Sequence, residues 1–372
     1  MKPPGLYVHI PFCRSKCPYC AFFSVPSTSL IPRWLEAFKK EVVYYKDQFK
    51  RFDSLYLGGG TPTWLETGAL SSLMDCIRGQ FDFDASSEMT IEANPCDVTR
   101  EKMRALKDMG FNRVSLGVQS FDDRALSLLG RRHRAEHNEK AIRDLRSSGF
   151  ENISMDILYG FEGQSTRDVI HTLRKAISCQ PEHLSCYQLT IEKKTLFWKL
   201  RERGVSLPLR EEDERAFFLA TSQFLEENGY MHYEISSFAR EAGYRSRHNM
   251  KYWQHAPYLG LGPSAHSFHA SRRWWNVASV RRYCAALERG RAPVEDSENL
   301  SNEQLEFESI MLGLRTRNGF DQKRVSNNHQ SREMLAGLRN SGFLNIANGR
   351  VAPTRKGFLM ADYLATCLGP IP

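Results

Sequence analysis

Apolar residues in the first 195 positions follow two spacings. Short apolar runs are typical of buried strands, whereas apolar residues that recur every three or four positions are typical of helices. The predicted strands are Leu6–Ile10, Ser54–Leu57, Met89–Glu92, Arg113–Val118, Ile153–Tyr159 and His183–Leu189. The predicted helices are Leu30–Gln48, Gly68–Ile77, Thr99–Met109, Asp122–Leu129, Glu136–Ser147 and Thr166–Ile177. Repeated strand-then-helix units predict an α/β fold with a parallel sheet, a partial (β/α)6 barrel whose chemistry lies at the carboxyl ends of the strands.

The second half of the chain has a less regular pattern, and residues 230–295 show no clear periodicity. The predicted helices are Arg210–Asn228, Leu300–Leu314, Ser331–Asn340 and Gly357–Leu364. Asn348-Gly349 lies between two short apolar runs and is a strong hairpin signal. Helices followed by a hairpin indicate a small, mainly helical, winged-helix-like unit. We therefore expect a core barrel over 1–205, a barrel extension over 206–295 and a C-terminal domain over 296–372.

Three cysteines follow the first predicted strand in the string CRSKCPYC. Cys13, Cys17 and Cys20 have CxxxCxxC spacing, and thiolates are ligands for iron–sulfur clusters or zinc. Three thiolates can hold a 4Fe–4S cluster and leave one iron open to a small molecule. A structural zinc site would need a fourth ligand, which His9 could supply. No other pair among the nine cysteines has ligand spacing, so we expect the others to be free thiols of a cytoplasmic protein.

The cysteine string resembles a known superfamily. CxxxCxxC with an aromatic residue, Tyr19, before the third cysteine is similar to the signature of the radical S-adenosylmethionine superfamily. The longer string LYVHIPFCRSKCPYC resembles its anaerobic coproporphyrinogen III oxidase/dehydrogenase branch. The resemblance covers nearly the whole chain, including a HemN-like C-terminal segment. It implies a TIM-like partial barrel of the radical SAM type, and a 4Fe–4S cluster whose open iron binds S-adenosylmethionine.

The resemblance also implies which side chains hold the cofactors. The string Gly58-Gly59-Gly60-Thr61-Pro62 resembles the segment that contacts the methionine moiety. Carboxylates would suit the ribose hydroxyls or the amine, and Arg131 would suit the carboxylate. The expected cofactor-binding residues are Tyr7, Tyr19, Gly59, Gly60, Thr61, Glu92, Gln119, Arg131 and Asp156.

Two features separate the branches of this family. The dehydrogenase pattern has a fourth cysteine two residues after the third, where this chain has Phe22, and a longer segment before the cluster. In contrast, His248-Asn249-Met250-Lys251-Tyr252-Trp253 fits the HNxxYW pattern of the HemW-type heme chaperones. A neutral imidazole can ligate heme iron, and aromatic rings offer a flat apolar surface. The resemblance thus implies heme contacts by His248, Asn249, Tyr252 and Trp253, with His255, His266 and His269 as rival ligands.

Charge adds one further constraint. Lys plus Arg total 51 against 43 Asp plus Glu, a net charge of +8, and residues 240–291 contain ten basic and only two acidic residues. Such a segment attracts an anion, which could be a nucleic acid, a lipid surface or a carboxylate ligand. Heme carries two propionates, for which arginine is the preferred partner. The other interpretation of this segment is a solvated loop face.

These observations favour a heme chaperone that binds heme, a 4Fe–4S cluster and S-adenosylmethionine and delivers heme to respiratory hemoproteins. The alternative is an enzyme, an oxygen-independent coproporphyrinogen III dehydrogenase. A nucleic-acid-binding protein is a third hypothesis, which leaves the cysteine loop unexplained, so we expect no nucleic-acid partner. No stretch of 18 apolar residues is present, and peripheral membrane contact remains open.

Overall fold

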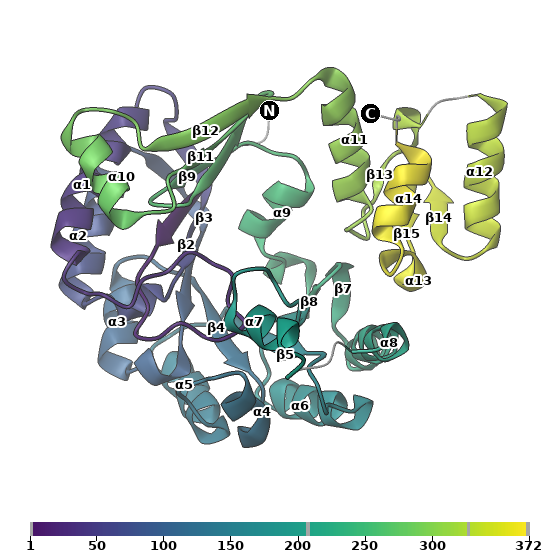
Figure 1. The fold of residues 1–372 in the computed structure, drawn as a ribbon, viewed down its shortest axis with the longest axis horizontal. Coiled ribbons are helices and arrows are strands. Elements are labelled where there is room, and N and C mark those ends of the chain that lie inside the picture. The colour runs from purple at the N-terminus through teal and green to yellow at the C-terminus, as the bar shows by residue number, and fades with distance from the viewer. Residues whose placement is uncertain (1–2, 206–208, 326–327, 370–372) are drawn as a thin grey trace.

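One twelve-stranded sheet forms the main body of the computed structural model, which describes residues 3–205, 209–325 and 328–369. The strand order is β12-β11-β10-β9-β1-β2-β3-β4-β5-β6-β8-β7. The central strands are β1 (Gly5–Ile10), β2 (Arg51–Gly59), β3 (Asp82–Ala93), β4 (Arg113–Gln119), β5 (Ile153–Tyr159) and β6 (His183–Gln188). These strands are parallel in sequence order, and the sheet curves without closing (Figure 1). The predicted partial barrel is confirmed.

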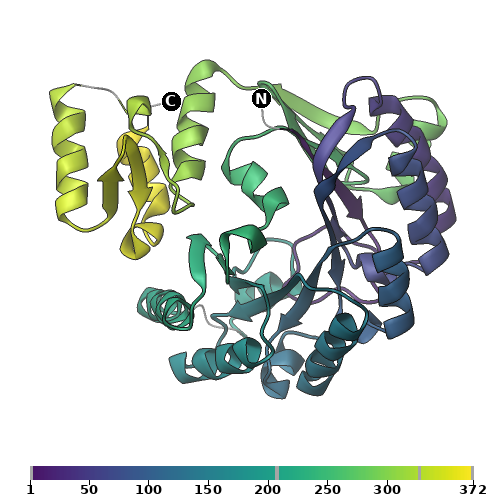
Figure 2. The ribbon, with the colours of Figure 1, turned by 180° about the vertical axis from the view of Figure 1, so that it is seen from behind.

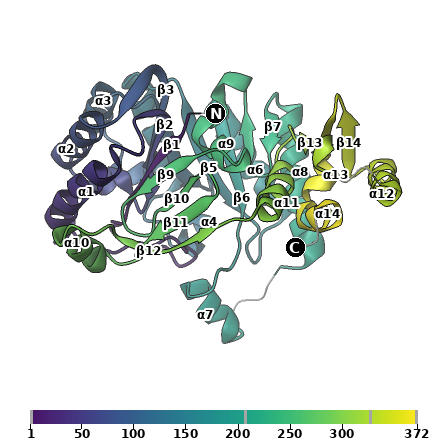
Figure 3. The ribbon, with the colours of Figure 1, turned by 90° about the horizontal axis from the view of Figure 1, so that it is seen from above.

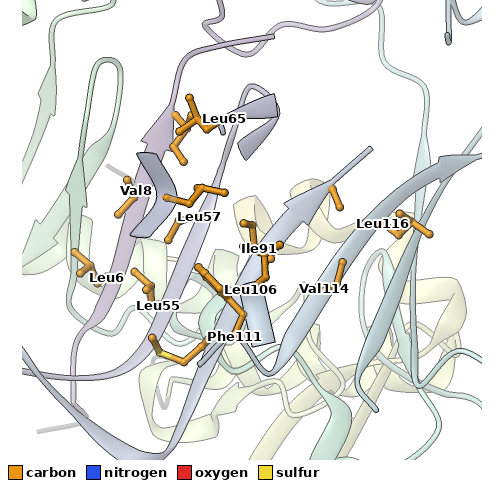
Figure 4. Close-up of a cluster of buried hydrophobic side chains, with 14 of the residues drawn as sticks. Leu6, Val8, Leu55, Leu57, Leu65, Ile91, Leu106, Phe111, Val114 and Leu116 are labelled. Atoms are coloured by element: carbon orange, nitrogen blue, oxygen red, sulfur yellow. The ribbon is translucent and has the colours of Figure 1, made fainter. Parts of the chain in front are cut away.

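Helices cover the outer side of this curved sheet (Figures 1 and 2). They are α1 (Ile31–Tyr45), α2 (Thr67–Arg78), α3 (Arg100–Asp108), α4 (Asp123–Leu128), α5 (Ala135–Ser147) and α6 (Thr166–Ser178). Alternate strand residues such as Leu55, Leu57 and Ile91 point toward them and are fully buried (Figure 4). The residues between them, such as Tyr56, point into the barrel interior, because successive strand side chains face opposite sides. The alternation therefore divides an apolar outer core from a polar interior.

Residues 231–299, most of which belong to the region without clear periodicity, add short strands to both edges of the sheet and two helices between them. They are β7 (Met231–Glu234), β8 (Ser237–Ala239), α9 (Arg247–Trp253), β9 (Tyr258–Leu261), β10 (His266–His269), β11 (Arg272–Asn276), α10 (Val280–Glu288) and β12 (Val294–Asn299). Strand β9 is parallel to β1, whereas β10, β11 and β12 are antiparallel to their neighbours. Polar and charged residues interrupt the apolar positions of these strands, as in RRWWN of β11 and VEDSEN of β12, so no strand pattern is readable.

The C-terminal residues form a smaller unit with its own apolar core. Its elements are α11 (Asn302–Gly313), β13 (Phe320–Asp321), α12 (His329–Asn340), β14 (Leu344–Ala347), β15 (Arg350–Pro353), α13 (Arg355–Phe358) and α14 (Ala361–Leu368). The predicted hairpin is present as β14 and β15. Its turn residues Asn348 and Gly349 have φ angles of 50° and 71°, as a type I′ turn requires. On α8 (Glu211–Glu227), Glu226 accepts hydrogen bonds from Arg317 and Arg355 and joins this unit to the barrel.

Helix α9, which contains the HNxxYW motif, lies at the amino ends of the central strands. The backbone N–H groups of Arg247 and His248 donate to Glu88 at 2.9 Å each, and the His248 ring lies beside Ser54 and Gly5. Gly5 begins β1, whose opposite end leads into the cysteine loop. At about 3.3 Å per residue, the two ends of β1 are roughly 17 Å apart. Among the described helices, none combines the length and hydropathy needed to cross a membrane.

Candidate functional site

The three motif cysteines lie on the long loop between β1 and α1. Backbone bonds from Cys13 N to Val25 O and from Val25 N to Pro11 O close the base of this loop. Cys13, Cys17 and Cys20 line one cavity together with Tyr19, Gly60, Thr61 and Arg131. The cavity therefore brings the cysteine loop, the glycine-rich loop after β2 and the loop after α4 into one site.

The contacts of the thiols fit a cluster held by thiolates. Cys13 Sγ lies 3.4 Å from Thr61 Oγ1, and the Arg131 guanidinium donates to Cys17 Sγ at 3.5 Å. Burial raises the pKa of the Cys13 and Cys20 thiols, and a bound metal would favour their thiolates. Within the described residues, no three His, Cys, Asp or Glu side chains already form a metal site. Two observations therefore support a cluster at this site: the three thiol ligands and the cavity that they share.

The glycine-rich loop packs against the cysteine loop without room for side chains. Gly59 has a φ of +103°, and a Cβ there would lie 2.5 Å from the His9 ring. A Cβ on Gly60 would lie 2.6 Å from the carbonyl oxygen of Phe12. Only glycine permits this approach of two backbones. Gly60 N and Thr61 N donate to the carbonyl oxygens of Ile10 and Phe12, which fixes the backbone of the string at the edge of the cavity.

Arg131 connects the cavity to strand β4. Its guanidinium donates to Gly117 O at 2.9 Å and to the Tyr19 hydroxyl at 3.4 Å, while its Nε is buried without a partner in the described residues. Gln119 ends β4 with a φ of +63°, an uncommon conformation for a residue other than glycine. A buried guanidinium with a spare donor is well suited to a carboxylate ligand, as the predicted role of Arg131 requires.

Two acidic side chains occupy the barrel interior. Glu92 accepts hydrogen bonds from the Tyr56 hydroxyl at 2.9 Å and from Gly59 N at 3.1 Å. Burial and the nearby Asp156 raise the pKa of Glu92 to about 7. Burial raises the pKa of Asp156 to about 6, although Ser115 donates to both of its oxygens. The strands therefore bring the two predicted carboxylates together, and such a pair can bind hydroxyl or ammonium groups.

Tyr7 and His9 connect this interior to the cysteine loop. The Tyr7 hydroxyl lies 3.0 Å from His9 Nδ1, and His9 Nε2 lies 2.8 Å from the carbonyl oxygen of Phe23. Burial raises the pKa of Tyr7 and lowers that of His9 to about 4. The imidazole is neutral, with Nε2 at the end of the cysteine loop and Nδ1 at Tyr7, so neither nitrogen is left for the alternative zinc site in this conformation.

The predicted heme residues lie far from the cysteines. His248 is 1% exposed, with Nδ1 3.1 Å from Ser54 Oγ and Nε2 2.9 Å from the Tyr252 hydroxyl. Burial lowers its pKa to about 3. Asn249 is half-buried on α9, and Trp253 packs near Tyr233 and Met250. Both nitrogens of His248 are engaged in this conformation, so ligation of heme iron would require the bond to Tyr252 to break.

Within the described residues, three of the ten basic residues in 240–291 pair with carboxylates from outside that segment. The basic strand β11 pairs with the acidic strand β12. Arg273 forms ion pairs with Glu298 and Glu308, and Lys251 forms one with Asp53. The sequence could not reveal these pairs, because every one of these carboxylates lies outside the basic segment. The local field around α9 is therefore weaker than the charge count suggested.

Two functional contacts were missed by the sequence analysis. Tyr56 holds Glu92 and stacks on His248 with ring centroids 5.3 Å apart, and His9 holds the cysteine loop. A signal for Tyr56 was present, since it stands between Leu55 and Leu57, whose side chains face the outer core. A polar residue between two buried leucines on a central strand must face the interior.

Comparison with known proteins agrees with this geometry. The Radical SAM superfamily model matches residues 7–176, and the HemN C-terminal domain model matches residues 300–360. The heme chaperone HemW of Bacillus subtilis is 33% identical over 368 residues, 96% of each chain. The heme chaperone HemW of Escherichia coli is 36% identical over 274 residues, 72% of this chain and 70% of its own.

A solved structure supports the fold independently. Coproporphyrinogen III oxidase (HemN) from Escherichia coli, a radical SAM enzyme, superimposes with a TM-score of 0.84 at 24% identity. The match covers 98% of this chain and 89% of that one. The curved sheet, the cysteine loop and the identity to relatives along the whole chain lead to one assignment. This protein belongs to the HemW family of the radical SAM superfamily.

Proposed function

We propose that this protein is a heme chaperone that binds heme and delivers it to respiratory hemoproteins. The observation that carries the proposal is the 33% identity to the Bacillus subtilis heme chaperone over 96% of both chains. This sequence identity extends over both the barrel and the C-terminal unit. Proteins that share a fold with HemN but differ in function are expected, because function depends on the site rather than the fold.

The cofactor site of the proposal is the cavity of the cysteine loop. Cys13, Cys17 and Cys20 would hold a 4Fe–4S cluster, and S-adenosylmethionine would bind its open iron. Gly60 would present its backbone to that ligand, and Arg131 would pair with its carboxylate. The cluster, when bound, supplies an electron that can cleave the sulfonium. The protein residues bind and orient these groups and exclude water.

The competing function is oxidative decarboxylation of coproporphyrinogen III. Phe22 stands where the dehydrogenase pattern has its fourth cysteine, and its side chain is 67% exposed. An anaerobic assay with coproporphyrinogen III, S-adenosylmethionine and a reductant separates the two functions. We expect no protoporphyrinogen IX from this chain, together with stable binding in a heme titration. Sustained turnover would replace the chaperone assignment with the dehydrogenase.

The heme ligand is tested by a pair of variants on α9. We propose His248 as the ligand, which requires its Nε2 to leave the Tyr252 hydroxyl. His248→Ala should then change the heme absorption spectrum and weaken binding at least tenfold. Tyr252→Phe removes only the competing hydroxyl, so it should keep the spectrum and bind heme as tightly or more tightly. The measurement is a heme titration of each variant followed by absorption spectroscopy.

Controls distinguish a ligand from a structural histidine. His248→Ala also removes a buried ring that contacts Ser54, so its folding must be checked by circular dichroism and its iron content measured in parallel. An unchanged spectrum in folded His248→Ala would contradict ligation by His248. Substitution of the exposed His266, and then of His255 and His269, would then identify the ligand.

A further inference from the structure

Helix α7 (Leu196–Glu202) projects from the body of the protein beside the cysteine loop (Figure 3). None of its residues is buried. It is attached to the loop by a backbone bond from Phe197 N to Pro18 O at 3.0 Å, and by ring contact between Phe197 and Tyr19 at 6.4 Å. Thr195 caps its first turn by accepting from Trp198 N. The helix is therefore ordered locally but contributes little to the apolar core.

Large apolar side chains on and after this helix remain in solvent. Leu196 is 55% exposed and Val205 is 67% exposed, and Phe197, Trp198 and Leu200 are only half-buried. Single exposed apolar residues are common on protein surfaces. Here the chain places them within ten residues of one another, on a projection rather than in a groove. Apolar residues gathered in this way mark an interaction site.

The same segment is strongly basic. Residues 193–205 contain five cations, Lys193, Lys194, Lys199, Arg201 and Arg203, and one acidic residue, Glu202. All five cations are exposed. Within the described part of the chain, none of them forms an ion pair, and only Lys193 has an aromatic contact, over the Trp198 ring at 5.9 Å. The segment thus has a net charge of +4, and Glu192, directly before it, reduces this to +3 over residues 192–205.

We propose that residues 193–205 dock on an anionic lipid surface. A short helix with Leu, Phe and Trp beside Lys and Arg has the composition of an interfacial helix, in which apolar residues enter the headgroup region and cations contact lipid phosphates. A protein partner of ordinary affinity would need about 800 Å² of complementary surface on each side. A convex projection of seven helical residues offers less than that, whereas a deformable bilayer can enclose it.

The proposal goes beyond heme binding and does not depend on it. Because α7 is bonded to the cysteine loop, docking would turn the cofactor cavity toward the membrane. The docking itself is testable with lipid alone, without heme or S-adenosylmethionine.

The experiment is vesicle flotation of the full chain after anaerobic reconstitution. We expect it to float with vesicles of phosphatidylcholine mixed with phosphatidylglycerol and not with phosphatidylcholine alone. Each cation near an anionic surface contributes roughly a fivefold change in binding. The double variant Lys199→Glu/Arg201→Glu should therefore bind at least tenfold more weakly, and Leu196→Glu should also release the protein. Raising the salt concentration should weaken binding by the unaltered chain.

Matched controls lie elsewhere on the surface. Tyr363→Glu changes another side chain that is 57% exposed, and Arg281→Glu reverses another exposed cation; both should bind vesicles normally. No flotation of the unaltered chain, equal flotation with neutral vesicles, or unchanged flotation of both α7 variants would overturn the proposal. Iron content and heme affinity, measured on the same variants, should not change. If the unaltered chain does not bind heme, the chaperone function is rejected, whereas the docking result still holds.

Discussion

Replacing Cys13, Cys17 and Cys20 together with Ala is expected to abolish iron binding. The unaltered chain should hold about four irons after anaerobic reconstitution with iron and sulfide, and the triple variant should hold essentially none. The physical reason is that these thiols are the only cysteines that line the cavity beside Gly60 and Arg131. The measurement is iron and sulfide analysis together with the visible absorption spectrum of the cluster.

The control uses cysteines that are not fully buried and lie outside the loop. Cys76, Cys96, Cys179 and Cys367 can be replaced together with Ser, while the buried Cys186 and Cys284 are left in place. This variant should keep the full iron content. A triple variant that retains iron would show that the ligand assignment is wrong. Circular dichroism of both variants excludes unfolding as the cause of any loss.

Glu41→Ala is expected to cause the largest loss of stability among single substitutions discussed for this protein, about 4 kcal/mol. Glu41 on α1 is 0% exposed. It accepts hydrogen bonds from Gly262 N at 2.8 Å, Asn276 Nδ2 at 2.6 Å and the Tyr283 hydroxyl at 2.5 Å. Alanine would leave Gly262 N–H, the Tyr283 hydroxyl and one of the two N–H bonds of Asn276 Nδ2 buried without an acceptor, and each such group costs about 1–3 kcal/mol. Urea unfolding followed by circular dichroism measures the free energy of unfolding.

Two comparisons show whether the hydrogen bonds are the cause. Glu41→Gln keeps the shape and one acceptor oxygen, so it should lose less stability than Glu41→Ala. Glu36→Ala, on the same helix, removes only a surface ion pair with Lys39 and should change stability by less than about 0.5 kcal/mol. A Glu41→Ala variant no less stable than Glu36→Ala would contradict the role of this carboxylate.

The sequence predicted the central barrel because long periodic segments encode it. Each of the six predicted strands coincides with one of β1–β6, and the predicted Asn348-Gly349 turn forms between β14 and β15. The structure also brings the predicted cysteines, glycines and Arg131 into one cavity. Residues that follow successive parallel strands must meet at one end of the sheet, so their proximity was foreseeable.

The rest depends on contacts between residues far apart in the chain. Strands β7–β12 contain three to six residues each, and polar or charged residues interrupt their apolar positions, so no periodic pattern stands out. The motif helix α9 lies at the amino ends of the strands, where its position is set by Glu88 and Ser54. No local pattern around His248 indicates that its imidazole is buried. Likewise, the ion pair between Arg273 and Glu308 joins two segments that have no relation in sequence.

The polar interior has a consequence for how protons exchange on unfolding. Five histidines are buried, His9, His133, His183, His232 and His248. Burial lowers the pKa of each, to about 4 for His9 and about 3 for His133, His232 and His248. In the unfolded chain these groups titrate near 6.5. Unfolding below that pH therefore takes up protons, so this contribution to stability is present above pH 6.5 and is lost as the pH falls toward 4.

Buried carboxyl groups act in the opposite direction. Burial raises the pKa of Glu41, Glu92 and Glu234 to about 7 and that of Asp156 to about 6. Unfolding between about pH 4 and pH 7 releases their protons, so their contribution is present at low pH and is lost as the pH rises through the folded values. The four carboxyl groups therefore offset part of the proton uptake by the five histidines between about pH 5 and 6.

Stability should therefore fall on mild acidification, but less steeply than the five histidines alone would cause. Glu234→Gln removes one carboxyl group that releases a proton on unfolding. The fall in the free energy of unfolding below pH 6 should therefore become steeper by about 1.4 kcal/mol per pH unit. Urea midpoints at pH 6.5, 5.5 and 5.0 measure both slopes. A fall in the unaltered chain as steep as that of Glu234→Gln would show that this buried carboxyl group offsets nothing.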